Sequence, residues 1–482
     1  MLLKCERIPW KALCVISVFQ VSCSTISTNA REGRERREQS SDPVSGSGAM
    51  VASTFRATAI AAVRQPVTTI KLGIANVWNR PREIIVGNLP FHLHAEAVPE
   101  VAPGTPEFEA LLDRKKFPQS QRGSIKFLVD GRSFFPELDR QIASARSSID
   151  CQVFIFDNDD IAVRTADSLK RRGNEVRVQV LFDDMGSTFA YSAPPSTPAP
   201  RGFAPPVDMR DYLRKDSNVQ VRRSLNPWLT CDHTKLFVFD QRSAILGGMN
   251  IGREYFSEWH DLMVRVDGPI VASLSREFDR AWRKAGPMGD FALFEKPAVF
   301  RKPPPAGEGI PLRILRTDAA EGRHEIMEAT LLAIRAARKR VWIENPYFAH
   351  DEIVDAAQDA ARRGVDVRVV IPASGDSKIM DGGNLATARS LIAAGAKVYR
   401  YPKMTHTKAM ICDGWGSLGS ANLDALSLRI NRELNLAFSD AATIRDFENR
   451  VFKPDFRRSK LMRLADVQSP TAGLAEILAD QL

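Results

Sequence analysis

The pattern of apolar and polar positions predicts alternating strands and helices from about residue 124 onwards. A β-branched and aromatic run lies at 148–156, a helical pattern follows at 161–172, and a second apolar run lies at 176–182. Short apolar runs of this composition are typical of buried strands, whereas the stretch between them repeats at the helical period. This order predicts a β-α-β unit, in which a helix connects two parallel strands.

The same order returns in the second half of the chain. An apolar run at 340–348, a helical pattern at 351–364 and an apolar run at 365–371 repeat the earlier unit, and KRRGNEVRVQVLF aligns with ARRGVDVRVVI. Self-similarity of this kind indicates an internal duplication. We therefore expect an α/β protein built from two equivalent domains.

Two histidine motifs occupy equivalent places in the two copies. The first, HTKLFVFDQRSAILGGMN, begins at His233, and the second, HTKAMICDGWGSLGSAN, begins at His406. The histidines are 173 residues apart, whereas Asn250 and Asn422 at the motif ends are 172 apart. A single deletion in the second copy explains the difference.

The apolar run after the lysine of each motif predicts a strand. Residues two apart in a strand point to the same face, so His233 and Lys235 are expected to share a face. The same holds for His406 and Lys408. The small residues of GGMN and GSAN are expected to turn the chain tightly after the next strand, where each asparagine amide can face the same cleft.

An acidic residue follows each histidine at a matched distance. Asp261 lies 28 residues after His233, and Glu433 lies 27 residues after His406, which again differs by the one deletion. A carboxylate bonded to the far nitrogen of an imidazole sets the tautomer and basicity of the ring. We expect these two acids to orient the two histidines.

The paired motifs resemble the HxKxxxxD…GSxN motifs of the phospholipase D superfamily, and the resemblance covers roughly residues 125–455. It implies two duplicated phospholipase D-like α/β domains, each a mixed β-sheet flanked by helices, with the active site at their pseudo-twofold interface. The first motif departs from the family with Gly248 in place of serine, a change expected to weaken one phosphate contact. The second motif lacks one residue before GSAN, and neither change removes a reacting group.

Displacement at a phosphodiester without a metal requires a nucleophile, an acid for the leaving alkoxide and cations for the phosphoryl oxygens. The resemblance implies a phosphohistidine intermediate, with His233 as nucleophile, His406 as acid and then base, and no metal or other cofactor. It implies an ion-paired structural role for the aspartate of each motif. The candidate catalytic residues are His233, Lys235, Asp240, His406, Lys408 and Asp413, supported by Asn250, Asn422, Asp261 and Glu433.

Local sequence narrows the substrate. The stretches at 247–271 and 419–440 resemble the corresponding stretches of bacterial cardiolipin synthases, particularly the Trp259-His260-Asp261 triplet. This resemblance implies transfer of a phosphatidyl group from phosphatidylglycerol to the hydroxyl of another lipid. Hydrolysis of phospholipids to phosphatidic acid through the same intermediate is the alternative, followed by a nuclease and by a non-enzymatic lipid-binding protein. His260 itself is expected to be a hydrogen-bonded core residue.

Charge and cysteine content bear on partners and cofactors. The net charge of +9 favours anionic partners, which include phospholipid headgroups and nucleic acids. The chain shows no basic groove interleaved with stacking aromatics, so we expect a phospholipid substrate and an anionic membrane surface and no nucleic acid. The six cysteines have neither the number of a disulfide framework nor the spacing of zinc ligands.

The amino-terminal region predicts a leader. Basic residues precede the apolar run Ala12–Cys23, which is too short to span a membrane and suits a secretory signal. Val21-Ser22-Cys23 is weakly similar to a lipoprotein signal, and the alternatives are a disordered leader or a true start at Met50. We expect a membrane-associated protein of the bacterial cell envelope.

Composition also suggests the domain boundaries. A Pro-rich insertion at 192–207, absent from the second copy, predicts a loop that acts as a lid or as a spacer. The Ala-rich stretch 50–65 predicts either a membrane-surface helix or, more commonly, a packed helix. The expected segments are a leader and linker at 1–49, an extension at 50–123, domains at 124–300 and 301–460, and a tail at 461–482.

Overall fold

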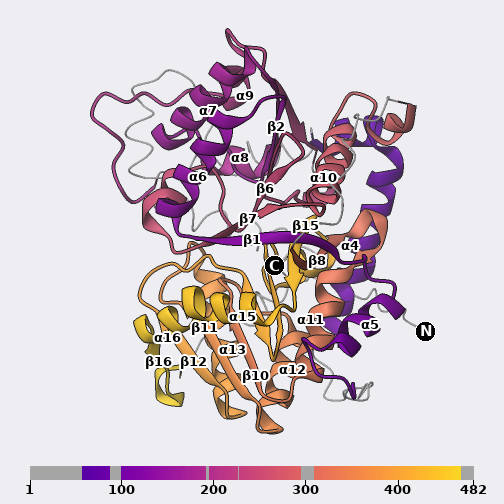
Figure 1. The fold of residues 1–482 in the computed structure, drawn as a ribbon, viewed down its shortest axis with the longest axis vertical. Helices are drawn as coiled ribbons and strands as arrows, with labels where there is room; N and C mark the ends of the chain where they lie inside the picture. The colour runs from indigo at the N-terminus through magenta and orange to yellow at the C-terminus, as the bar shows by residue number, and fades with distance from the viewer. Residues whose placement is uncertain (1–56, 87–98, 192–194, 226, 295–308, 468–482) are drawn as a thin grey trace, which may run out of the picture.

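The computed structural model describes residues 57–86, 99–191, 195–225, 227–294 and 309–467. Two similar α/β halves lie one above the other, with β1 (Gln121–Val129) and β8 (Ile310–Asp318) running between them (Figure 1). The apolar run Ala12–Cys23 and its predicted leader role lie outside the described residues.

Each half contributes seven equivalent strands to one continuous mixed sheet. From one edge to the other, the main strand order is β4-β3-β2-β5-β6-β7-β1-β8-β15-β14-β13-β10-β11-β12, which reads the same from both ends once equivalent strands are matched. The remaining first-half strands are β2 (Ser148–Val153), β3 (Arg177–Asp183), β4 (Gln220–Ser224), β5 (Leu236–Phe239), β6 (Ser243–Gly247) and β7 (Leu262–Asp267). Those of the second half are β10 (Arg340–Glu344), β11 (Asp366–Pro372), β12 (Lys397–Tyr401), β13 (Ala409–Cys412), β14 (Trp415–Gly419) and β15 (Glu433–Phe438).

The sheet is parallel in its outer parts and antiparallel in its centre. In the first half β2, β3 and β4 are parallel, as are β10, β11 and β12 in the second. The halves are joined where β1 pairs with β8 over Gln121–Gly123 and Ile310–Leu312. Two short strands add to the sheet: β9 (Arg323–His324) pairs with β8, and β16 (Lys460–Leu461) pairs with β12.

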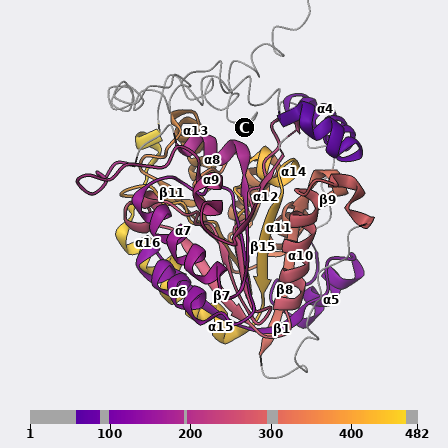
Figure 2. The same cartoon turned by 90° about the horizontal axis from the view of Figure 1, so that it is seen from above.

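Helices cover both faces of the sheet (Figure 2). In the first half these are α6 (Gly131–Ser144), α7 (Asp160–Gly173), α8 (Asp184–Ala190), α9 (Met209–Arg214) and α10 (Val271–Lys284). In the second half they are α11 (Glu325–Ala336), α12 (Asp351–Arg362), α13 (Lys378–Ala393), α14 (Ala425–Arg429), α15 (Ala441–Phe447) and α16 (Lys453–Arg458). Helices α4 (Pro66–Val86) and α5 (Pro106–Arg114), together with a helical stretch at 57–64, precede the sheet.

Apolar burial explains why the two halves are one body. One core lies between the first-half sheet and α6 and α7, and a second lies under α11 and α12. A third core draws apolar side chains from both halves, with Phe127 of β1 stacked on Phe447 of α15 at 4.9 Å between ring centroids. Removing this shared surface from water favours the joined arrangement.

The predicted β-α-β units are confirmed. The first is formed by β2, α7 and β3, and the second by β10, α12 and β11. Capping signals set the start of α7, because Asp159 accepts a hydrogen bond from the amide of Ala162 at 2.8 Å. The described part of the Pro-rich insertion, 195–207, contains no helix or strand.

The amino-terminal helices lie outside the duplicated unit. Residues 57–64 are helical, and Ala57, Ala61 and Gln65 are buried, so the stretch packs on one face. Across the described ranges, no helix combines the length and the apolar character needed to cross a bilayer.

Candidate active site

The histidine and lysine of each motif lie just ahead of a strand rather than within it. β5 begins at Leu236 and β13 at Ala409, one residue after the lysines. The prediction that the strands include the histidines was therefore wrong by a few residues. The reason is tertiary, because each of these extended segments pairs with a segment of the other half.

The first of these pairings between the halves places the first histidine motif beside Glu433, the acid of the second half. The amide of His233 donates to the carbonyl of Arg432 at 2.9 Å, and the amide of Arg432 donates to the carbonyl of Cys231 at 2.9 Å. The next residue, Glu433, is thereby placed beside the imidazole. Its carboxylate oxygens lie 2.9 and 3.1 Å from Nδ1 of His233.

The second crossing repeats this arrangement. The amide of His406 donates to the carbonyl of His260 at 2.6 Å, and the amide of His260 donates to the carbonyl of Met404 at 3.0 Å. Asp261, the next residue, lies with its carboxylate 2.7 Å from Nδ1 of His406. Each acid therefore orients the histidine of the opposite half, a crossed pairing that offsets measured within each half do not reveal.

The two lysines lie directly behind the histidines. Nζ of Lys235 donates to the carbonyl of His233 at 2.7 Å, and Nζ of Lys408 donates to the carbonyl of His406 at 2.8 Å. Both lysine side chains are buried. Burial lowers the pKa of Lys235 to about 7 and the pKa of Lys408 to about 8.

Burial also decides the protonation of the other groups. Burial and the nearby lysines lower the pKa of His233 and of His406 well below the usual value, so both imidazoles are neutral near pH 7. Burial raises the pKa of Asp261 to about 7 and the pKa of Glu433 to about 8. The acids and the lysines therefore titrate close to neutrality. A phosphodiester anion that enters beside the two lysines will favour the charged ammonium form of the lysines.

Asp240 and Asp413 are not brought together with the histidines. They follow the distal ends of β5 and β13, and both adopt positive φ angles, of 54° and 50°. Asp240 accepts hydrogen bonds from the amides of Arg146, Ser147 and Ser148, and Asp413 accepts from those of Arg338, Lys339 and Arg340. The carboxylates therefore fix the turns of the fold through backbone amides, where an ion pair with a basic side chain was expected.

The two motif asparagines occupy different surroundings. Asn250 accepts a hydrogen bond from the amide of Ile155 at 3.0 Å and donates to the hydroxyl of Tyr255 at 2.8 Å. Asn422 is buried, and its Oδ1 has no hydrogen-bond partner in the described part of the chain. Asn250 therefore has a structural function that leaves less of its amide available to a ligand.

The half that contains Gly248 also contains the shorter of the two orienting acids, Asp261. In the second half, Oγ of Ser420 donates to Glu433 at 2.5 Å. At Gly248 a Cβ atom would lie 2.3 Å from Oδ1 of Asp261, so no side chain fits there. Ser420 thus binds the orienting acid Glu433, and Gly248 lacks the corresponding hydrogen bond to Asp261.

Different aromatic side chains pack against the two histidines. Phe154 packs edge-on against His233 at 4.8 Å between centroids, and Lys235 lies over the same ring. Tyr255 and Trp259 pack against His406 at 5.5 and 5.3 Å. The resemblance at 247–271 had drawn attention to Tyr255 and to the Trp259-His260-Asp261 triplet, whereas nothing in the sequence marked Phe154 as a neighbour of His233.

His260 links the two halves as a buried cation. Nδ1 lies 2.6 Å from Asp130 of the first half and Nε2 lies 3.1 Å from Asp455 of the second, and the ring stacks on Tyr401. Although burial opposes the charge, these hydrogen bonds raise the pKa of His260 well above its usual value. The residue is a hydrogen-bonded core histidine, as expected.

Two groups of side chains in the described residues are close enough to hold a metal ion, and neither includes His233 or His406. The first contains His260, whose two ring nitrogens are already bonded to carboxylates and whose raised pKa keeps it protonated. The second contains Asp157, Asp159 and Glu254, where burial and mutual repulsion raise the pKa of Asp157 to about 7. In both groups, bound protons rather than a metal cation can balance the negative charge of the carboxylates.

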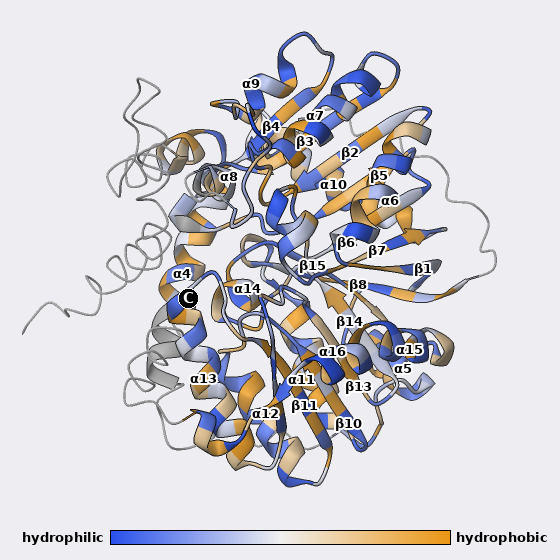
Figure 3. Ribbon diagram, turned by 90° about the vertical axis from the view of Figure 1, so that its left-hand side faces the viewer, coloured by the Kyte–Doolittle hydropathy of each residue, from blue (hydrophilic) through white to orange (hydrophobic). Residues whose placement is uncertain are grey.

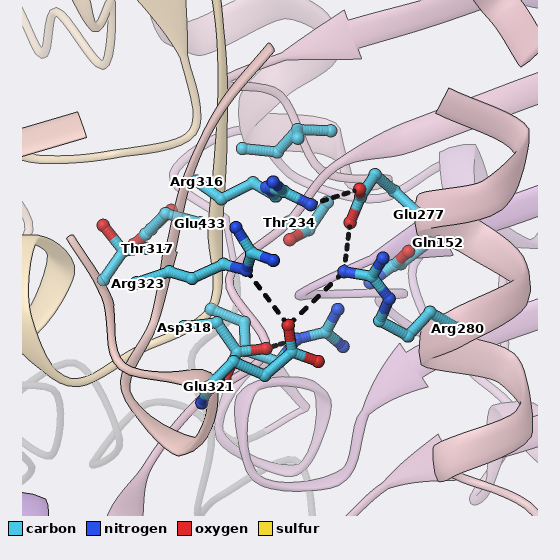
Figure 4. A pocket seen from close by; sticks show the side chains of 12 residues that line it. Gln152, Thr234, Glu277, Arg280, Arg316, Thr317, Asp318, Glu321, Arg323 and Glu433 are labelled. Carbon is cyan, nitrogen blue, oxygen red and sulfur yellow. Dashed lines mark hydrogen bonds and ion pairs between the residues drawn. The ribbon is translucent and has the colours of Figure 1, made fainter. Parts of the chain in front are cut away.

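A small pocket lies between α10 and β8 (Figure 4). Thr234 and Glu433 line one part of it, but the remaining lining consists mainly of paired charges. Arg316 and Arg280 both bind Glu277, at 2.8 and 3.4 Å. None of the histidines and lysines of the two motifs lines this pocket, which is a region of ion pairs between the halves.

Comparison with known proteins supports the family assignment. The family described as cardiolipin synthase, PLD-like domain, matches residues 138–282 and 331–453. Cardiolipin synthase A of Pseudomonas aeruginosa strain LESB58 is 31% identical over 387 residues, which cover 75% of this chain and 76% of that protein. Cardiolipin synthase A of Pseudomonas putida strain W619 is 31% identical over 354 residues, which cover 70% and 68%.

The fold has a solved counterpart. The crystal structure of phosphatidylserine synthase from Haemophilus influenzae Rd KW20 matches with a TM-score of 0.60 and 13% sequence identity, covering 78% of this chain and 100% of that chain. At this identity the likeness concerns the fold alone. Together with the two matched regions of the family, it confirms the predicted pair of phospholipase D-like domains. The chain therefore belongs to the cardiolipin synthase family of the phospholipase D superfamily and is an enzyme of that superfamily.

Proposed function

We propose that the protein is a phosphatidyltransferase of the cardiolipin synthase type, which moves a phosphatidyl group from phosphatidylglycerol to a lipid hydroxyl. The observation that carries this proposal is the pair of neutral histidines, each oriented through Nδ1 by a buried acid and each backed by a lysine. This arrangement leaves both Nε2 atoms for reaction and supplies cations for phosphoryl oxygens.

In the first step, Nε2 of His233 attacks phosphorus and the bond to the leaving glycerol oxygen breaks. His406, protonated once the phosphodiester has entered, gives its proton to that oxygen. Glu433 stabilises the positive charge that develops on His233, while Lys235 and Lys408 face the phosphoryl oxygens. The result is a phosphatidyl group on His233 and a neutral His406.

In the second step, His406 takes the proton of the acceptor hydroxyl as its oxygen attacks phosphorus. The bond between phosphorus and His233 breaks, and Asp261 stabilises the imidazolium that forms on His406. Water in place of the lipid hydroxyl gives phosphatidic acid, so hydrolysis is the alternative outcome of the same intermediate.

The position of the Pro-rich insertion favours transfer over hydrolysis. The amides of Ser196 and Thr197 donate to the carboxylate of Glu258 at 3.1 and 2.7 Å. Glu258 directly precedes Trp259, which packs against His406. The insertion is therefore bound to the segment that packs against His406, and we propose that it excludes water from this side of the site.

The proposed partners follow from the reaction. Substrate and product are phospholipids, and the relatives named above are cardiolipin synthases. We propose association with an anionic membrane surface of the bacterial cell envelope, with no nucleic acid as substrate.

The test is to incubate the purified protein with phosphatidylglycerol in mixed micelles and to identify products by mass spectrometry. We expect cardiolipin and glycerol from the wild type and neither from His233→Ala. Phosphatidic acid as the main product, with ample acceptor lipid present, would assign the protein as a phospholipase D. Cleavage of DNA without turnover of lipid would overturn both assignments.

A further inference from the structure

One side of the amino-terminal helical region carries large apolar side chains that face solvent. In the described part of the chain, seven of the thirteen exposed large hydrophobic residues fall at positions 60–78. Their spacing of three or four residues places them on one helix face. Those within α4 are Val67 (51% exposed), Ile70 (64%), Ile74 (64%), Val77 (75%) and Trp78 (72%), and we call them the α4 stripe.

The opposite face of α4 is firmly seated on the protein. Leu72 is buried against Ala319 and Ala320. The amide of Thr68 donates to Asp290 at 2.8 Å, and Nε1 of Trp228 donates to the carbonyl of Thr69 at 2.7 Å. The helix is thus held by specific contacts, and the exposure of the α4 stripe follows from the way it is held.

Neighbouring elements enlarge the apolar surface. Trp228 lies in η1 (Pro227–Leu229) and is 47% exposed, while Phe291, in η3 (Gly289–Phe294), is 48% exposed. Met288 precedes η3 and is 42% exposed. With these three, ten of the thirteen exposed large hydrophobic residues of the described chain lie on the helical region 57–78 and on the elements that support it, which marks an interaction surface.

This surface lies on the same side of the molecule as the catalytic edge of the sheet. The histidines precede β5 and β13, which are antiparallel to β2 and β10, so they lie at the carboxyl ends of β2 and β10. Helices α8 and α14 follow strands at this edge, and α4 lies on the same side in two perpendicular views (Figures 2 and 3). η1 connects them, because Trp228 binds α4 five residues before His233.

The charge of the surface selects an anionic partner. The stretch 57–78 contains two basic residues, Arg64 and Lys71, both exposed, and no acidic residue. An apolar stripe flanked by cations, with a tryptophan near one end, has the composition of helices that lie in the boundary between lipid headgroups and acyl chains.

We propose that α4 docks the protein on an anionic phospholipid bilayer, with the α4 stripe in the headgroup and acyl boundary and the catalytic edge turned towards the membrane. The inference rests on the proposed function, because phosphatidyl transfer requires access to lipids held in a bilayer. It adds the element that makes this contact and the direction from which substrate reaches the histidines.

A second copy of the chain is the competing occupant. Spacing by alternate steps of three and four residues also fits a seam between two helices. That alternative places the α4 stripe against itself, so it predicts a dimer in solution whose stability depends on the same side chains.

The test compares the full-length wild type with Ile74→Asp/Val77→Asp in sedimentation with vesicles of phosphatidylcholine containing phosphatidylglycerol. Leu461→Asp/Leu464→Asp, at exposed positions in and beyond the outermost strand of the second half, is the matched control. We expect the α4 variant to bind at least tenfold more weakly and the control to bind as the wild type does. Turnover of phosphatidylglycerol in detergent micelles should be unchanged in both variants, which shows that they are folded.

Equal binding of vesicles by the wild type and the α4 variant would overturn the inference. A wild-type dimer that the α4 variant converts to a monomer, with vesicle binding unchanged, would overturn it in favour of the second copy. The two proposals fail separately. Binding through α4 without transfer in micelles would refute the proposed function alone, and transfer without α4-dependent binding would refute the docking alone.

Discussion

Replacing Glu433 by glutamine tests the crossed arrangement of acids and histidines most directly. The carboxylate is fully buried and lies 2.9 Å from Nδ1 of His233. Glutamine keeps the shape of the side chain, but it cannot take on the negative charge that stabilises the imidazolium as it forms on His233. Its amide can also donate to the ring, which favours the wrong tautomer.

The expected loss follows from the strength of this contact. A hydrogen bond to a charged group contributes about 1.5–3 kcal/mol, which corresponds to a rate effect of about 10–150-fold. The wrong tautomer adds to this, since removal of the charge of an orienting acid reduces turnover by up to about 10⁴-fold. We expect Glu433→Gln to lower turnover of phosphatidylglycerol by about 10²–10⁴-fold.

The crossed pairing also predicts which step each acid serves. With His233 as nucleophile, Glu433→Gln slows formation of the phosphatidyl-enzyme. Asp261→Asn acts on His406, so it slows transfer of the phosphatidyl group to the acceptor and the intermediate accumulates. Acid quenching after mixing with radiolabelled phosphatidylglycerol measures the enzyme-bound label in each variant.

Glu344→Gln is the matched control, because Glu344 is fully buried near the site and bonds Thr405 instead of a catalytic ring. Burial raises the pKa of Glu344 well above its usual value, so the amide replaces a neutral acid and turnover should change less than threefold. Wild-type turnover by folded Glu433→Gln would remove Glu433 from the site. Accumulated label in Glu433→Gln but not in Asp261→Asn would exchange the roles of the two histidines.

Three further changes test other parts of the structure. Deletion of residues 196–206 should raise phosphatidic acid relative to cardiolipin, measured by mass spectrometry; an unchanged ratio would leave transfer standing but refute the shield. Gly248→Ser should lower turnover at least tenfold, because its Cβ meets Asp261 at 2.3 Å; turnover equal to that of the wild type would show that the strand end adjusts. His260→Gln should lower the free energy of unfolding at pH 7 by about 3 kcal/mol in urea denaturation, because it removes the buried cation that lies between the carboxylates of Asp130 and Asp455. The raised pKa of His260 means that its contribution is complete below pH about 6.5 and is lost as pH rises through the raised value, so the gap should narrow at alkaline pH; a gap independent of pH would refute the imidazolium.

Local pattern was sufficient for the repeated units of the fold. The run at 148–156 and the helix at 161–172 became β2 and α7 because their apolar periods coincide with the faces that the sheet buries. The outward α4 stripe was not predictable in this way. A helix that leaves apolar residues exposed has the same sequence period as one that packs them, and only the contacts of its other face distinguish the two.

The residues of the candidate site were predictable from the sequence, but the pairing of each acid with a histidine was not. Residue types and spacing identified both histidines, both lysines and both acids, but partner choice depends on the crossing of 231–233 with Arg432. Matched offsets carry no information on this point, because a duplicated chain has equal offsets whether its acids serve their own half or the other. The strand start after Lys235 was missed for the same reason.

The crossed contacts have a consequence for how the two halves can diverge after duplication. A substitution at Asp261 alters the ring that belongs to the other copy, so neither half can drift to a separate specificity by changing its own motif alone. The first half combines Gly248 with the shorter acid Asp261, whereas the second half combines Ser420 with the longer acid Glu433. The two halves thus meet one geometric requirement in two different ways. A fragment that contains only one half would hold a histidine without its acid and an acid without its histidine. Both halves are therefore needed to form either complete pair.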